Sequence, residues 1–189
     1  MEKGYLFILI GAVFAATLHV PMPFQIFFWW NQLTFWGFLF VSLGMRQIMG
    51  TEKELRYAQF FTMLTLLLRL GIPWISNIFP STLVLALDLS LAFSSLAIFF
   101  WLFKSEYLWS PSSTKRMDWY IYSAIALIYL VLKVALMLPM VVSRISLSTF
   151  MTLLDAIQFV NLLYNIVLVG LLVKLYLAAK NDTGLTTWN

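Results

Sequence analysis

Four charged side chains lie inside otherwise apolar stretches of the sequence, and they are the residues most able to do chemistry: Arg69, Asp88, Lys133 and Asp155. A charged residue at the centre of a membrane helix costs about 2.5 to 3.5 kcal/mol on insertion, so it is retained for pairing or for function. Arginine and lysine bind carboxylate and phosphate groups, and an aspartate balances them or carries a proton. The four residues predict ion pairs between helices, a polar site, or a site whose walls the ion pairs hold.

The order of these residues suggests that a helical hairpin has been duplicated. Arg69 is followed by a proline, then by a Ser-Thr pair, five further residues and Asp88. Lys133 is followed in the same way by a proline, a Ser-Thr pair, five residues and Asp155. Chance is the alternative explanation, because serine and threonine are common at helix starts. The pattern predicts that Arg69 faces Asp88 and that Lys133 faces Asp155, all in the outer half of the membrane.

Other polar side chains extend this candidate site. Steps of three and four residues predict one polar face on the last apolar segment, formed by Asp155, Gln158, Asn161 and Asn165. Asn31 lies in the second apolar segment, and His19 lies beside the prolines that end the first. The structural alternatives are hydrogen bonds between helices, worth about 0.6 kcal/mol each, and an interfacial histidine. The functional alternative is a lining that contacts a ligand or responds to protons.

The composition limits what these residues can do. Of the 189 residues, 62% are hydrophobic and only 11% are charged, against about 25% charged in soluble domains. There is no cysteine and a single histidine, so thiolate or multi-histidine metal sites cannot form in one chain. No phosphate-binding loop, nucleophile elbow or zinc-protease motif is present. We therefore predict no enzyme activity, no metal and no cofactor.

Six apolar segments must position the charged residues. A bilayer core of about 30 Å needs roughly 20 apolar residues in a helix, and helices satisfy their own backbone polar groups in lipid. The segments cover residues 5–20, 24–49, 55–79, 81–103, 118–142 and 146–177. They predict an all-α bundle of six transmembrane helices that forms a single integral membrane domain over residues 1–189. The last segment is longer than a bilayer requires.

The basic residues predict the orientation of the bundle. Of the twelve lysines and arginines, nine fall on the side of the two termini, two lie inside helices, and only Arg144 falls on the other side. Because basic residues flank the cytoplasmic ends of spans, both termini are predicted to be cytoplasmic in a multi-pass protein of the cell membrane. Topology and contact with anionic lipids explain the net charge of +4 better than binding to nucleic acid does.

Two classes of function fit these features. The first is a small-solute binding or transport protein with a polar site in the outer half of the bilayer, and its ligand would be small and polar or anionic. The second is a non-catalytic accessory subunit of a larger membrane complex, for example a respiratory one, or a membrane sensor. In that case the partners are other membrane subunits or further copies of the chain. A water-filled pocket touching Arg69 or Lys133 favours the first class. Dry, closed ion pairs, with a large apolar flank in contact with other chains, favour the second.

Overall fold

The computed structural model describes residues 2–16, 24–49, 52–75, 81–108, 113–137 and 146–185, and these residues are helical almost throughout. The helices are α1 (Glu2–Ala16), α2 (Phe24–Ile48), α3 (Lys53–Ile75), α4 (Ser81–Phe103), the π-helical turn η2 (Lys104–Leu108), α5 (Ser113–Met137) and α7 (Leu147–Leu185). The described part of the chain contains no strand. The predicted all-α class is confirmed.

Within the residues that the structure describes, three stretches are long and apolar enough to cross a membrane: Leu83–Leu108, Ser113–Leu136 and Leu147–Asn181. They belong to α4 with η2, to α5 and to α7. By length and composition the chain is therefore a membrane protein. α7 has 39 residues, which corresponds to about 58 Å at the helical rise and exceeds a bilayer core of about 30 Å. The predicted excess length of the last helix is confirmed.

Observed helix ends match the predicted ones where the run of apolar residues and the helix end together. α4 begins at Ser81 and ends at Phe103, as predicted. α5 begins five residues before the predicted start, at Ser113, and α7 continues to Leu185. The apolar pattern marks the part of a helix that faces lipid, whereas backbone hydrogen bonding continues into polar flanking residues.

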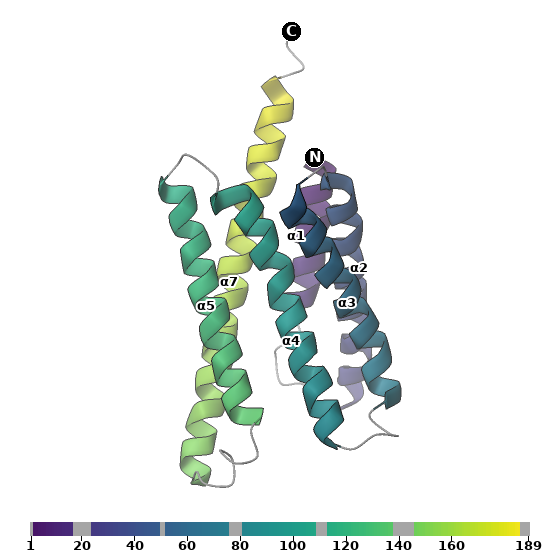
Figure 1. Cartoon of the computed structure of the whole chain (residues 1–189), viewed down its shortest axis with the longest axis vertical. Helices are drawn as coiled ribbons and strands as arrows, with labels where there is room; N and C mark the ends of the chain where they lie inside the picture. Colours follow the sequence, from purple (N-terminus) through teal and green to yellow (C-terminus); the bar gives the residue numbers. More distant parts are fainter. Residues whose placement is uncertain are drawn as a thin grey trace.

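The helices form three hairpins, α1 with α2, α3 with α4, and α5 with α7, and these pairs make the most extensive contacts. Figure 1 shows α4 between the α1–α3 group and the α5–α7 pair. α1 begins and α7 ends at the same end of the molecule. Because α2, α4 and η2 also end there, the basic residues at these helix ends share that end of the bundle.

Two pairs of glycines hold α1 against α2. A Cβ atom added at Gly44 would lie 2.5 Å from the carbonyl oxygen of Gly4, and one added at Gly37 would lie 2.7 Å from that of Gly11. On each helix the two glycines are seven residues apart, which is close to two helical turns. The backbones therefore approach too closely for any side chain at these positions, and dispersion contacts replace lipid along the seam.

At the end where α1 begins, η2 connects three separate elements. Ser105 donates a hydrogen bond to Glu52, just before α3. The Tyr5 hydroxyl on α1 donates to Glu106 Oε1 at 2.5 Å, and the Tyr107 hydroxyl donates to the carbonyl oxygen of Leu171 on α7 at 2.9 Å. A π-helical turn is rare and redirects successive side chains, and here three consecutive residues reach three different partners.

Candidate functional site

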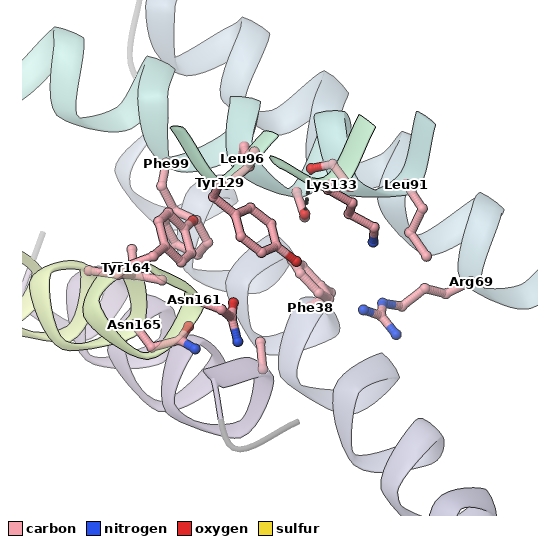
Figure 2. Close-up of a pocket in the computed structure, with 14 residues that line it drawn as sticks. Phe38, Arg69, Leu91, Leu96, Phe99, Tyr129, Lys133, Asn161, Tyr164 and Asn165 are labelled. Atoms are coloured by element: carbon pink, nitrogen blue, oxygen red, sulfur yellow. Dashed lines mark hydrogen bonds between the residues drawn. The ribbon is translucent and has the colours of Figure 1, made fainter. Parts of the chain in front are cut away.

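A cavity of about 80 Å³ lies among the helices and takes lining side chains from all six of them. Its polar lining comes from Arg69 on α3, Tyr129 and Lys133 on α5, Asn161, Tyr164 and Asn165 on α7, and Ser95 on α4. Figure 2 shows the side chains of Arg69, Lys133 and Tyr129 pointing toward the same space. Arg69 and Lys133, two of the four charged residues singled out in the sequence, thus line one cavity.

Three charged residues determine the electrostatics of this cavity. Asp88 interacts electrostatically with both Arg69 and Lys133. The guanidinium carbon of Arg69 also lies 5.2 Å from the ring centroid of Phe38 on α2, within the range of a cation–π contact. Two positive side chains thus interact with one carboxylate.

Asn161 adds an amide that needs a partner. The residue is only 7% exposed, and its Oδ1 atom has no hydrogen-bond partner among the residues that the structure describes. Leaving a buried polar atom unsatisfied costs about 1 to 3 kcal/mol. A donor from a water molecule or a ligand in the cavity would remove that cost. Asn165, one turn further along α7, lines the same cavity.

Two tyrosines, Tyr129 and Tyr164, line the cavity, and a third, Tyr122, contacts Tyr164. The hydroxyl groups of Tyr122 and Tyr164 are 3.0 Å apart, and the Tyr122 hydroxyl donates to the carbonyl oxygen of Leu96 at 3.2 Å. The ring of Tyr129 stacks on that of Tyr164, with their centroids 6.1 Å apart. Because Tyr122 and Tyr164 are buried and hydrogen-bonded, they fix the position of α5 relative to α7 beside the charged residues.

A second pocket, of about 320 Å³, continues from the cavity between α5 and α7. It shares Tyr129, Lys133 and Asn161 with the cavity. Its remaining lining is mainly apolar and consists of Leu136, Leu154, Ile157 and Gln158. Leu136 is near the end of α5 and Leu154 near the start of α7, so this outer pocket leads away from the end of the bundle that holds the start of α1.

The predicted charge pairs are partly right. Arg69 and Asp88 interact, as their spacing predicted. The predicted pairing of Lys133 with Asp155 is wrong, because Lys133 interacts with Asp88 and Arg69 instead and Asp155 is exposed on α7. The sequence repeat therefore does not produce two equivalent charge pairs.

The predicted polar face of α7 is also only partly right. Asn161 and Asn165 line the cavity, Gln158 lines the outer pocket, and Asp155 lines neither. Two successive steps of three residues rotate a side chain by about 120° around the helix axis. Asp155 is two such steps before Asn161, and this rotation carries it to another face.

Two further predicted residues cannot be compared. His19 lies outside the described residues, and Asn31 belongs to α2 but its side chain is outside them. Sequence reasoning missed Tyr129 and Tyr164. Helical spacing could have identified both tyrosines. Tyr129 is four residues before Lys133 and Tyr164 is three residues after Asn161, so each lies on the same helix face as a predicted site residue.

Within the described ranges, no group of three or more histidine, aspartate or glutamate side chains could hold a metal ion. Hydrogen-bond donors and two cations lie among apolar side chains in the lining of the cavity. Such a lining can bind and orient an anionic group through charge-assisted hydrogen bonds. Comparisons with family models, curated proteins and solved structures find no match for this chain.

Proposed function

We propose that this chain is a membrane-embedded protein that binds or transports a small organic anion. The observation that carries the proposal is the cavity into which Arg69 and Lys133 point while sharing the single carboxylate of Asp88. Positive charge inside a membrane is costly unless an anion balances it. A ligand with one negative charge would add a second carboxylate to the two cations and one carboxylate that the described residues bring together.

The sizes of the two pockets support a ligand with a charged end and an apolar body. The cavity of about 80 Å³ has room for a carboxylate group or a few water molecules at roughly 30 Å³ each. The outer pocket of about 320 Å³ is at the lower end of the usual range of about 300 to 1,000 Å³ for small-molecule sites. Leu136, Leu154 and Ile157 would contact the apolar body. Short-chain carboxylates have this chemistry.

The membrane arrangement of the proposal has six crossings, with both termini on the cytoplasmic side of the cell membrane. The start of α1 and the end of α7 lie at the same end of the molecule (Figure 1), which supports an even number of crossings. The basic residues gathered at that end support its cytoplasmic placement. The outer pocket would then open toward the outer half of the bilayer, where a solute arriving from outside would enter.

The proposal is tested by measuring thermal stability and binding heat of the purified protein in nanodiscs with acetate, butyrate and hexanoate. A ligand at 100 times its Kd stabilises the folded state by about 2.7 kcal/mol. We expect carboxylates to raise the melting temperature, while neutral amides of the same length do not. Lys133→Met should weaken carboxylate binding at least tenfold, because it removes a charge-assisted hydrogen bond worth about 1.5 to 3 kcal/mol.

Two variants serve as controls for this measurement. Lys133→Arg keeps the positive charge and should retain most of the binding. Lys115→Gln removes an exposed lysine at the start of α5, far along that helix from the cavity, and should bind like the parent. Equal responses to amides and carboxylates, or unchanged binding in Lys133→Met, would refute the proposed ligand class.

One observation favours the second candidate, a non-catalytic subunit of a larger membrane complex. Asp155 is exposed on α7, within a stretch apolar enough to cross the membrane. Its exposed neighbours include the apolar Phe159 and Leu162, at 67% and 58% exposure, and the polar Thr152 and Gln158. Another membrane chain with a basic residue would cover this face and satisfy the carboxylate. Purification from native membranes decides between the candidates, since a stoichiometric partner that is lost in Asp155→Leu supports the complex subunit.

A further inference from the structure

A groove of about 380 Å³ runs along the surface between α4 and α5, and Leu96 is the one described residue that lines both it and the cavity. Phe93, Ala97 and Trp101 line it from α4, and Ser123, Ala126 and Leu130 line it from α5. The two alanines are buried at its base, at 8% and 7% exposure. Small side chains between larger ones at the rim create the hollow.

The groove has the length of one leaflet. From Phe93 to Trp101 the groove follows α4 for eight residues, which is about 12 Å at the helical rise. Half of a bilayer core is about 15 Å. Both helices contain stretches apolar enough to cross the membrane, so the surface between them faces acyl chains. A neighbouring transmembrane helix would need a seam along its whole span, and this hollow is about two turns long.

Positive charge lies at one end of the groove. The Lys104 ammonium group is 4.6 Å from the ring centroid of Trp101, the last groove residue on α4. Lys115 and Arg116 are exposed in the first turn of α5, at the same end of the bundle. Two of the described carboxylates lie nearby: Asp118 is bonded to Lys174 at 2.8 Å, and Glu106 accepts a hydrogen bond from Tyr5 and interacts electrostatically with Lys115. Basic side chains beside a tryptophan at a membrane surface are suited to a lipid phosphate.

We propose that this groove binds one anionic phospholipid from the leaflet adjacent to η2. One acyl chain lies in the hollow between α4 and α5, over Ala97 and Ala126. The phosphate contacts Lys104, and Lys115 and Arg116 add to the attraction. The inference depends on the membrane-crossing character of α4 and α5 and is independent of the ligand proposed for the polar cavity.

The test is native mass spectrometry of the purified full chain with phosphatidylglycerol or phosphatidylcholine that carry identical acyl chains. We expect one phosphatidylglycerol to be retained in preference to phosphatidylcholine. Lys104→Gln should reduce that preference about fivefold, the effect of one cation near an anionic lipid surface. Arg46→Gln, at the end of α2, removes an exposed cation distant from the groove and should leave the preference unchanged.

Two substitutions fill the groove itself. Ala126→Phe places a ring over its base, and Leu127→Trp does so from the rim, where the native side chain is 61% exposed and folding is less at risk. Either should lower the retention of both lipids. Equal retention of the two lipids by the parent chain would overturn the proposal, and so would unchanged retention in Leu127→Trp. Loss of a co-purifying protein in these variants, with lipid retained, would assign the groove to a protein partner instead.

Discussion

Replacing Gly11 with leucine is expected to separate α1 from α2 and to destabilise the protein by roughly 3 kcal/mol or more, the upper range for overpacking a tightly packed interface. A Cβ atom at this position would collide with the carbonyl oxygen of Gly37 and would lie 2.8 Å from the backbone nitrogen of Val41. A flexible side chain could move aside, but a helix backbone can yield only if the whole helix shifts. The measurement is the unfolding midpoint in detergent, with helix content followed by circular dichroism.

Gly170 on α7 provides the matched control. A Cβ atom added there has no atom within 4 Å, so Gly170→Leu makes the same chemical change in open space. Glycine is about 1 kcal/mol less favourable than alanine inside a helix, and leucine is close to alanine. Gly170→Leu should therefore be neutral or slightly stabilising. If the two leucine variants unfold at the same point, the close approach of α1 and α2 is not what holds this pair together.

The sequence predicted those parts of the fold that follow from the distribution of apolar residues along the chain. α4 matched its predicted ends at Ser81 and Phe103 because both ends coincide with the limits of the apolar run. The α1–α2 seam was not predicted, although glycines seven residues apart on both helices were visible in the sequence. Spacing within one helix identifies a face, but it does not identify which other helix packs there. The π-helical turn η2 depends on contacts with α1 and α7 that are distant in sequence.

The site was predictable in its chemistry and less so in its pairing. Arg69, Asp88 and Lys133 were expected to matter because charges in apolar segments are costly, and the structure brings the three together. Counting residues from the helix ends places Lys133 and Asp155 at a similar depth in the membrane, and this predicted that the two would pair within their hairpin. The structure shows that Lys133 interacts with Asp88, on the helix before it in the chain, because α4 lies between the two groups of helices. Depth can be counted from sequence, but the rotation of one helix about its axis relative to its neighbours cannot.

Asp88→Asn should produce the second large effect, a destabilisation of about 1 to 3 kcal/mol, the cost of leaving a charged group without its partner, because Arg69, Asp88 and Lys133 are all half-buried. The substitution preserves size and removes a carboxylate that interacts with both Arg69 and Lys133. The two cations would then repel each other in a medium that screens them weakly. The measurement is again the unfolding midpoint in detergent.

Asp155→Asn is the matched control, because the same change falls on an exposed residue of α7 and should shift the midpoint by less than about 0.5 kcal/mol. The double variant Asp88→Asn with Lys133→Met should recover much of what Asp88→Asn loses, since a single cation then remains. Equal losses in Asp88→Asn and Asp155→Asn would show that shared charge at the cavity does not determine stability.

Asp88→Asn also distinguishes a binding site from a purely structural ion pair. If the cavity accepts an organic anion, butyrate should restore stability to Asp88→Asn more than it stabilises the parent chain, because the ligand carboxylate supplies the charge that the variant has lost. A closed structural pair has no room for the ligand, and added butyrate would then leave the deficit unchanged. The cavity of about 80 Å³ beside Lys133 is the physical reason to expect recovery.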